Sequence, residues 1–363
     1  ERGKIAQMYT PAGAGESTEP AGGAATGRDG GDGRDRAGVR PRPDCAAPRS
    51  GSDPGERIPR RGRGQTLPHK CGLLPGVRPC PKRPDRGYKG AVRPTLPPDA
   101  LLLAPMVAVS HRALRELILG FGGLDLACTE MASAAAAVSG AYFERWFLDA
   151  EPEPERTLMQ FYTVKSERLI EALAHVADKG LFGVDLNFGC SAPQIRKAGG
   201  GVAWMGKPKE AAELCALARK NWEASLSAKM RIGESEDYGA LKDFASGLVE
   251  AGLDFLTLHP RLENERFRRK SRWDYVARLQ ADLPVPVLGN GDVKTVSDWA
   301  ARKAETGCAG IMIGRAAVQR PWLFALIKGR REDPGFELEI DLEATAYRFL
   351  DLVESRLPPE FHL

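Results

Sequence analysis

The pattern of apolar and polar positions changes at Leu101. From there, short apolar runs alternate with longer amphipathic stretches, which is typical of βα units on a parallel sheet. The helices predicted between the runs include 167–178, 207–221, 238–251 and 295–305. The eight runs predicted as strands are Leu101–Ala104, Leu124–Thr129, Thr157–Tyr162, Gly183–Asn187, Ser225–Met230, Phe255–Leu258, Val285–Leu288 and Gly310–Ile313.

Eight such repeats over about 230 residues match a (β/α)8 TIM barrel, whose active site lies at the carboxyl ends of the strands. A doubly wound open sheet is the competing fold, but no G-x-G-x-x-G opens the first helix. We therefore predict an α/β chain with a TIM barrel over residues 97–330.

The segments on either side of the barrel differ from it in composition. Residues 1–96 hold 18 Gly and 13 Pro with almost no apolar periodicity, so we expect a disordered Gly/Pro/Arg-rich extension. After the barrel, residues 331–363 contain one clear helix, Leu342–Arg356. We expect this end to be a short, truncated helical segment.

The net charge of +4 conceals two unlike parts. Residues 1–96 carry 19 basic and 10 acidic residues, whereas the remainder carries 33 basic and 38 acidic ones. The overall basicity therefore says nothing about nucleic-acid binding by the folded part, for which only a local patch counts.

The 363-residue chain has the 42% apolar content of a globular protein and no run of about 18 apolar residues that would cross a membrane. Its seven cysteines show no paired spacing, which favours a reducing compartment and a cytoplasmic protein. His69, Cys71 and Cys80 lack a close cysteine pair or a fourth ligand, so we expect no metal site.

Chemically rich residues follow all eight predicted strands. Eight such ends in register are hard to explain as surface decoration, so we expect one site. In chain order they are Pro105-Met106, Glu130-Met131, Gln160, Asn187 with Cys190, Lys229 with Arg231, His259 with Arg261, Asn290-Gly291-Asp292, and Gly314-Arg315.

Cys190 leaves the fourth strand as the chain turns, and Gly199-Gly200-Gly201 soon follows. A thiol presented among glycines at a strand end is placed for chemistry on a ligand. Packing alone more often leaves a cysteine inside an apolar face, as expected for Cys215.

The glycine-containing ends of strands 7 and 8 occupy the usual phosphate site of these barrels. Glycines let backbone N–H groups approach phosphate oxygens, and Arg315 offers a charge-assisted contact. Tight turns between strand and helix are the alternative explanation for Gly291 and Gly314.

The remaining strand ends suggest a ring and an anion. Lys229, inside the barrel, needs an anionic partner, and a phosphate or a reduced flavin edge would serve. Gln160 offers the donor and acceptor that match a flavin edge, and Asn187 would orient a base or a flavin. His259 with Arg261 contributes to an anion or ring site.

Taken together, these residues resemble the tRNA-dihydrouridine synthase family over roughly residues 101–324. The order and spacing of the whole set, more than any one motif, carry the resemblance. The segments are Ala104-Pro105-Met106, Thr129-Glu130-Met131, Asn187-Phe188-Gly189-Cys190 with Gly199–Gly201, Lys229-Met230-Arg231-Ile232-Gly233, His259-Pro260-Arg261, Gly289-Asn290-Gly291-Asp292 and Ile313-Gly314-Arg315 with Pro321-Trp322-Leu323-Phe324.

The resemblance implies an FMN-dependent oxidoreductase that uses NADPH to reduce the C5–C6 bond of a uridine in tRNA. Cys190 would protonate C5 while hydride from the reduced flavin reaches C6. The cofactor-binding residues carried over are Pro105, Met106, Gln160, Lys229, His259, Asn290, Gly291, Asp292, Gly314 and Arg315.

The implied tRNA substrate requires a basic mouth, because the target base must leave its stack. The candidates are Asn187, Arg196, Lys197, Arg231, Arg261 and the cluster 266–272. Ser191 replaces the family's usual proline, and the usual helical tRNA-binding domain is represented by 331–363 alone. No obligate protein partner is implied.

Two rival readings stay open. One is a dihydroorotate or dihydropyrimidine dehydrogenase-like FMN enzyme acting on a free pyrimidine. The other is a tRNA-binding barrel without catalysis.

Overall fold

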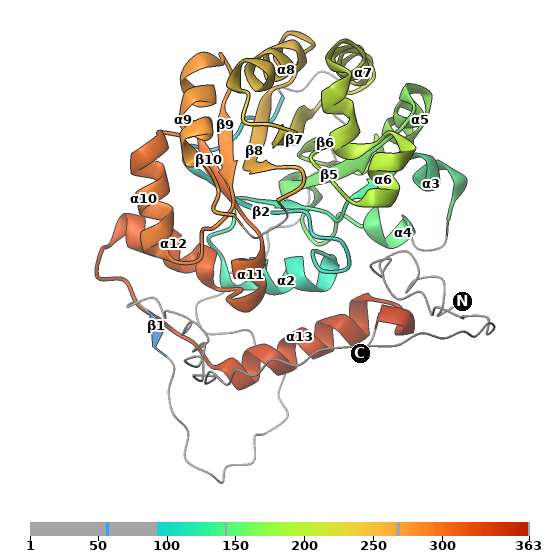
Figure 1. Cartoon of the computed structure of the whole chain (residues 1–363). Helices are drawn as coiled ribbons and strands as arrows, with labels where there is room; N and C mark the ends of the chain where they lie inside the picture. The colour runs from blue at the N-terminus through green and yellow to red at the C-terminus, as the bar shows by residue number, and fades with distance from the viewer. Residues whose placement is uncertain (1–55, 58–92, 142–143, 266–268, 362–363) are drawn as a thin grey trace, which may run out of the picture. The chain divides into compact units, whose positions relative to one another are not determined.

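The computed structural model describes residues 56–57, 93–141, 144–265 and 269–361. Within these residues the main sheet is entirely parallel and closes into a barrel (Figure 1). The strand order is β3-β2-β10-β9-β8-β7-β6-β5-β4, and the additional pairing of β3 with β5 completes the circle. The predicted (β/α)8 barrel is confirmed. The predicted extension lies mostly outside the described residues, as do His69, Cys71 and Cys80.

The eight barrel strands agree closely with the predicted runs. The short β4 (Ala132–Ser133) adds to the upper part of β5, and β1 (Glu56–Arg57) pairs separately with β11 (Leu338–Glu339). The barrel strands are β2 (Ala100–Leu103), β3 (Leu126–Cys128), β5 (Thr157–Tyr162), β6 (Gly183–Phe188), β7 (Ser225–Gly233), β8 (Phe255–Leu262), β9 (Val287–Asn290) and β10 (Gly310–Ile313).

Four strands depart from the prediction by two or more residues at an end, among them β3, which begins at Leu126 and not at Leu124. β9 begins at Val287 and not at Val285, because Pro286 has no N–H to donate to a ladder. β7 and β8 run three and four residues further than expected, to Gly233 and Leu262, with an irregular register between Arg231 and Gly233. These extensions raise the wall of the barrel beside β6.

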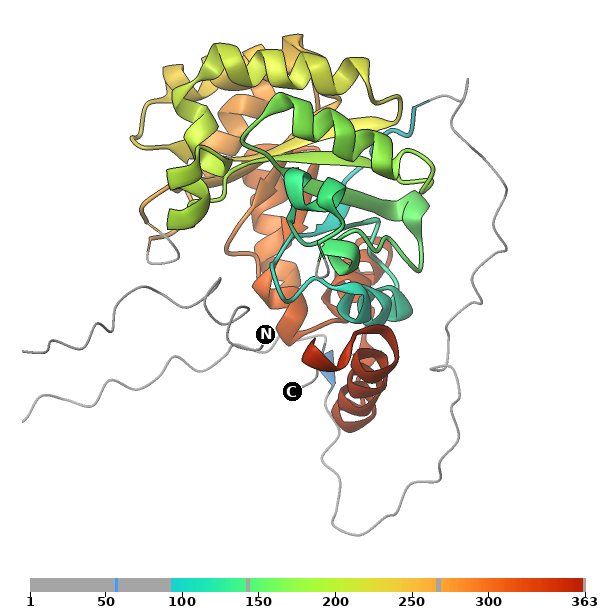
Figure 2. The same ribbon diagram turned by 90° about the vertical axis from the view of Figure 1, so that its right-hand side faces the viewer.

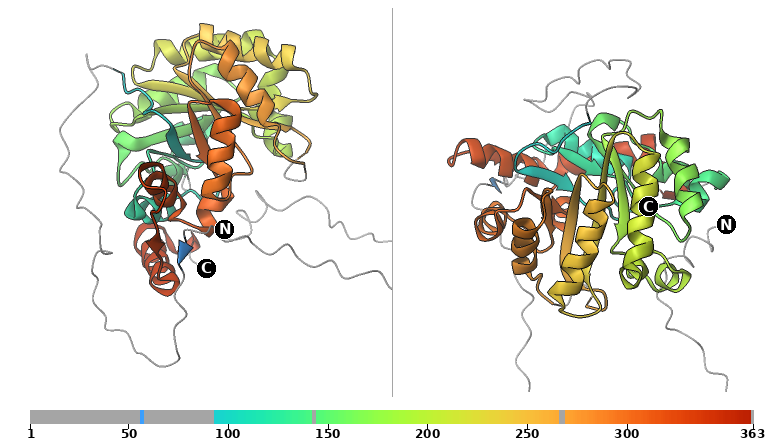
Figure 3. Two further views of the ribbon diagram at one scale, coloured as in Figure 1. Left: turned by 90° about the vertical axis from the view of Figure 1, so that its left-hand side faces the viewer. Right: turned by 90° about the horizontal axis from the view of Figure 1, so that it is seen from above.

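Helices lie outside the strands, as Figures 2 and 3 show. The five predicted helices are confirmed within two residues at each end, as α5 (Ser166–Val176), α7 (Pro208–Lys220), α8 (Tyr238–Glu250), α10 (Val296–Thr306) and α13 (Leu342–Arg356). The other helices are α2 (Arg112–Phe121), α3 (Ala134–Ser139), α4 (Glu144–Phe147), α6 (Pro193–Ala198), α9 (Trp273–Asp282), α11 (Arg315–Gln319) and α12 (Leu323–Glu332), with 3₁₀ turns η1 (Pro154–Arg156), η2 (Gly201–Gly206) and η3 (Pro359–Phe361).

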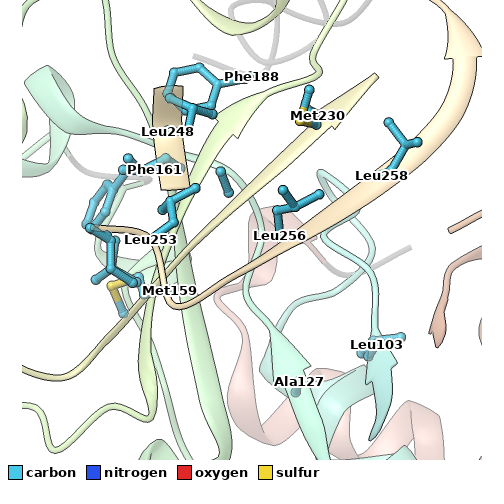
Figure 4. Packing of buried hydrophobic residues seen from close by; sticks show 14 of the residues in the cluster. Leu103, Ala127, Met159, Phe161, Phe188, Met230, Leu248, Leu253, Leu256 and Leu258 are labelled. Atoms are coloured by element: carbon cyan, nitrogen blue, oxygen red, sulfur yellow. The ribbon is translucent and has the colours of Figure 1, made fainter. Parts of the chain in front are cut away.

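The core has two parts, set by the alternation of side chains along each strand. Outward-facing residues such as Met159, Phe188 and Leu258 form one cluster with the helices (Figure 4). Inward-facing residues such as Leu102, Leu158 and Phe255 fill the lower barrel. Above them the inward positions turn polar, as at Gln160, Asp185 and Ser227.

The predicted helix α13 packs against α2. Leu352 and Leu357 bury apolar surface against Ala113 and Leu117. Arg356 Nε donates to Glu116 at 2.9 Å and anchors the end of α13. Among the described residues, no helix combines the length and apolarity needed to cross a membrane.

Candidate functional site

A chain of hydrogen bonds links the interior of the barrel to the cysteine after β6. Asp185 accepts from Ser227 Oγ and from Gln160 Nε2, both at 2.6 Å. Gln160 Oε1 accepts from Asn187 Nδ2 at 2.8 Å. Asn187 Oδ1 in turn accepts from the backbone N–H of Cys190 at 2.8 Å. The parallel register places Gln160 beside Asp185 and Asp185 beside Ser227, so neighbouring strands supply this chain.

Asn187 is fully engaged in holding this structure. Besides its bonds to Gln160 and Cys190, its Oδ1 accepts from Gly189 N at 3.1 Å and its Nδ2 contacts Met131 Sδ at 3.1 Å. An amide side chain has two donor hydrogens and two acceptor lone pairs, and all four are used. Gln160, by contrast, uses one N–H and one lone pair in these bonds.

The Cys190 thiol is partly buried, and burial raises its pKa above the ordinary value. A hydrogen bond from the Ala192 backbone N–H and the charges of Arg231 and Lys229 oppose this shift without reversing it. The thiol is therefore protonated at neutral pH, which suits a proton donor more than a nucleophile.

Lys229 lies beside Asn187 in the strand register, on the interior of β7. Burial, with repulsion from Arg231, lowers its pKa to about 8, although the Asp185 charge acts in the opposite direction. In the described part of the chain its ammonium group has no hydrogen bond or ion pair within contact distance. A cation held this way inside a barrel is a binding group for an anion or an electron-rich ring.

The ends of β8 and β9 form a compact turn. Gly291 has φ +124°, and a Cβ there would lie 2.4 Å from Ser271 Oγ and 3.0 Å from His259 Cδ2. Asn290 Nδ2 donates to the Met312 carbonyl at 2.7 Å, which joins this turn to β10. Only glycine fits at 291, because Ser271 and His259 pack directly against the backbone of the turn.

Arg261 lies inside this turn and not at the rim. Its Nη2 donates to both carboxylate oxygens of Asp292 at 2.7 Å, and its Nη1 lies 2.9 Å from His259 Nε2. Burial tends to raise the pKa of Asp292, but the hydrogen bonds and charge of Arg261 and the hydrogen bonds of Ser271 together outweigh it, so the pKa is lowered. Burial and then the charges of Lys229 and Arg231 strongly depress the pKa of His259, so its imidazole is neutral.

The structure adds one polar group that the sequence analysis overlooked. The Ser271 hydroxyl is buried beside the Gly291 turn, where it interacts with the Asp292 carboxylate without a hydrogen bond of good geometry. Its backbone N–H donates to Asp292 Oδ2 at 2.8 Å, which fixes its place. Ser271 lies inside the basic run 266–272, and no pattern in the sequence marks it as a buried residue.

The loop after β2 brings Met106 to the end of β10. A Cβ at Gly314 would lie 3.5 Å from Met106 Sδ. The Ser110 hydroxyl accepts from Met106 N at 2.8 Å and closes the turn that contains Pro105 and Met106. Glu130, after β3, also holds this loop, since its carboxylate accepts from Ala108 N.

The predicted basic residues fall into two groups. Arg231 is buried, and its guanidinium donates to the carbonyls of Gly189 at 3.1 Å and Leu262 at 3.0 Å. Arg272 is paired with Glu265 and Glu236 at 2.6 Å. The exposed members are Lys197, Arg269, Lys270 and Arg315. Arg196 is also exposed and is paired with Glu263 and Glu234. Arg266 and Arg268 lie outside the described residues.

Two cavities are lined by neither Cys190 nor Lys229. One of about 420 Å³ lies between η2 and α8, and Arg196 is the one predicted site residue that lines it. Another of about 510 Å³ lies at the opposite end of the barrel, lined by residues such as Gly123, Arg156 and Phe182. We place the candidate site by its chemistry, at Cys190 and Lys229, because neither cavity contains a comparable group.

Polar side chains gathered at the carboxyl ends of a closed parallel barrel define a (β/α)8-barrel enzyme. The sequence model of the family described as dihydrouridine synthase (Dus) matches residues 102–346. The chain belongs to the dihydrouridine synthase family, whose members are oxidoreductases, and the resemblance noted in the sequence is confirmed.

Bacterial relatives support this placement. A tRNA-dihydrouridine(16) synthase of Cupriavidus necator is 34% identical over 240 residues, covering 63% of this chain and 73% of the relative. A probable tRNA-dihydrouridine synthase of Mycobacterium tuberculosis is 33% identical, covering 62% of this chain and 61% of the relative. A tRNA-dihydrouridine(16) synthase of Aquipseudomonas alcaligenes is 29% identical, covering 72% and 86%. A solved structure described as QR15, an aldolase, has 10% identity and a TM-score of 0.42, and covers 64% of this chain and 95% of its own.

Proposed function

We propose that this protein is a tRNA-dihydrouridine synthase that reduces the C5–C6 bond of a uridine, with FMN as cofactor and NADPH as reductant. The observation that carries the proposal is the pairing of a protonated thiol with a cation that has no partner in the described part of the chain. Cys190 follows Asn187 on β6, and Asn187 is the register neighbour of Lys229 on β7. A proton donor and a ring-binding group thus open onto the same mouth.

The residues present fit FMN. Lys229 offers a buried positive charge, and the Gln160 amide offers a donor and an acceptor for a ring edge. The buried Ser271 hydroxyl and the close-approach glycine at 291 suit a phosphate. We assign Pro105, Met106, Gln160 and Lys229 to the ring, and His259, Asn290, Gly291, Asp292, Gly314 and Arg315 to the ribityl phosphate end.

Bound FMN would supply hydride to C6 of the pyrimidine. Cys190 then donates its proton to C5, and the raised pKa keeps that proton in place until the base arrives. The Ala192 N–H and the charges of Arg231 and Lys229 favour the thiolate that remains. Acid and hydride donor must approach opposite faces of a planar ring, and Cys190 at the strand end serves one face.

We propose that the tRNA lies across the exposed basic residues at the mouth. Lys197, Arg269 and Lys270 are exposed, and Arg196 is half exposed on α6. These positions match backbone phosphate contacts, which set affinity without reading sequence. Contacts of the base with Asn187, Arg231 or Arg261 stay predictions, since the first makes four contacts within the protein and the others are buried against neighbouring groups.

We also propose the division of the chain into an extension (1–96), the FMN-binding barrel (97–330) and the beginning of a helical tRNA-binding part (331–363), in a cytoplasmic enzyme. The packing of α13 on α2 supports placing that helix next to the barrel.

The test is to purify the protein, record its absorption spectrum, and assay NADPH-dependent dihydrouridine formation on unmodified tRNA, with the modified position mapped. We expect a yellow protein and dihydrouridine in the tRNA. A protein that cannot be reconstituted with FMN contradicts the proposal. Preferential reduction of free uracil or orotate supports the free-pyrimidine enzyme instead, and tRNA binding by a flavin-loaded protein without turnover supports the non-catalytic barrel.

A further inference from the structure

The hydrogen-bond chain from Asp185 to Cys190 has a direction. An ionised carboxylate can only accept hydrogen bonds, and a backbone N–H can only donate them. Gln160 must therefore turn its NH2 group toward Asp185, and Asn187 must turn its oxygen toward the N–H groups of Gly189 and Cys190. The middle contact, Asn187 Nδ2 to Gln160 Oε1, is the one orientation that satisfies both ends.

We infer that Asp185 is a positioning residue for Cys190: its carboxylate fixes the orientation of the Gln160 and Asn187 amides and so orders the cysteine loop. Asp185 is 1% exposed, and its side chain accepts hydrogen bonds from Gln160 and Ser227. Its effect on catalysis rests on the proposed function, whereas its effect on the loop does not.

Reversal of the chain has a specific cost. If position 185 donates to Gln160 Oε1, the Gln160 NH2 group faces Asn187 and needs the Asn187 oxygen as its acceptor. The Asn187 NH2 then meets the N–H groups of Gly189 and Cys190, so donors face donors and two loop hydrogen bonds are lost. Unsatisfied donors of this kind are costly in a buried setting, so the loop loosens.

When the oxygen of Asp185→Asn keeps accepting from Ser227 Oγ, its NH2 group turns toward Gln160 and introduces this competing donor. Ser227→Ala is the matched control. Ser227 also bonds Asp185, but its removal leaves the carboxylate as the acceptor for Gln160. The rescue is the double variant Asp185→Asn with Gln160→Glu. The new carboxylate at position 160 accepts hydrogen bonds from the NH2 group at position 185 and from the Asn187 NH2 group. The Asn187 oxygen then again faces the N–H groups of Gly189 and Cys190, so the loop hydrogen bonds are restored.

The measurement is hydrogen–deuterium exchange of the Gly189 and Cys190 amides in the full chain without added cofactor. We expect exchange about tenfold faster or more in Asp185→Asn, near wild type in Ser227→Ala, and restored in the double variant. If Asp185→Asn does not fold, a folded double variant with a protected loop gives the same support. Unchanged exchange in Asp185→Asn, or no rescue in the double variant, overturns the inference.

A second readout separates this inference from the proposed function. In the active enzyme, Asp185→Asn should lose both the exchange protection of the loop and the rate of dihydrouridine formation, while its affinity for tRNA stays constant. Absence of dihydrouridine formation in the wild type would refute the proposed function and leave the exchange result intact. Normal turnover in a variant whose loop has lost protection would refute the positioning role itself.

Discussion

Gly201 approaches Cys190 so closely that no side chain fits between them. A Cβ at position 201 would lie 2.4 Å from the Cys190 carbonyl oxygen and 3.0 Å from its Cβ. Gly201 also has φ +58°, and the next residue, Val202, donates its N–H to the same carbonyl at 3.0 Å. The glycine run thus sets the position of Cys190 by packing directly against its backbone carbonyl and its Cβ.

Gly201→Ala should therefore displace Cys190. A shift near 1 Å at a catalytic group lowers turnover by about 100-fold, and we expect a loss of that order. The measurement is dihydrouridine formation under saturating tRNA. Gly206→Ala in the same turn is the control, since a Cβ at 206 meets nothing within 4 Å. Equal activity of the two variants would contradict this view of the glycine run.

Lys229→Met should weaken FMN binding by about 10- to 100-fold, the range for a hydrogen bond to a charged group. With a pKa of about 8, Lys229 is protonated at pH 7 and loses its charge as the pH rises toward 9.5. The affinity of the wild type for FMN should fall over that pH interval. The affinity of the variant should be lower and should not change with pH. Titration by flavin fluorescence measures both. Parallel pH profiles in the two proteins would refute a role for this cation.

Glu144 gives a stability prediction outside the site. Burial raises its pKa to about 7, although a hydrogen bond from Ser133 N acts against the shift. A carboxyl whose folded pKa is raised favours the folded state below its unfolded pKa of 4.5, and that contribution is lost as pH rises through 7. Glu144→Gln should come close to wild type at pH 4 and be more stable at pH 8.

The gain at pH 8 has an upper bound of roughly 3 kcal/mol by the conversion of 1.36 kcal/mol per pKa unit. Urea unfolding at the two pH values measures it, and other titrating groups cancel because both proteins share them. A variant less stable than wild type at pH 8 would show that the charged form of Glu144 contributes favourably.

The barrel was predictable because a short apolar run for each strand is followed by a longer amphipathic stretch for a helix. This alternation can be recognised from the local sequence alone. Pro286 shows the limit at strand ends, where one missing N–H moved a boundary. The positions of Cys190 and Lys229 were also predictable, since side chains at carboxyl ends of parallel strands converge on one mouth.

The direction of long side chains was not predictable. Arg231 and Arg261 were expected to face tRNA, yet Arg231 bonds carbonyls of two loops and Arg261 bonds Asp292. Those acceptors come from distant segments that only the closed barrel brings together. Ser271 was missed for the same reason, because its burial depends on the Gly291 turn. Asp185 lay within an apolar run and gave no sign of the contacts it makes.

The most direct test of the account is a comparison of wild type with Cys190→Ala and Cys190→Ser in a single turnover of pre-reduced, FMN-loaded enzyme on unmodified tRNA. We expect both variants to keep FMN and bind tRNA, and we expect flavin reoxidation linked to dihydrouridine formation to slow by at least about 100-fold, within the range for loss of a general acid. Wild-type rates of dihydrouridine formation in Cys190→Ala would contradict the assignment of Cys190 as the proton donor.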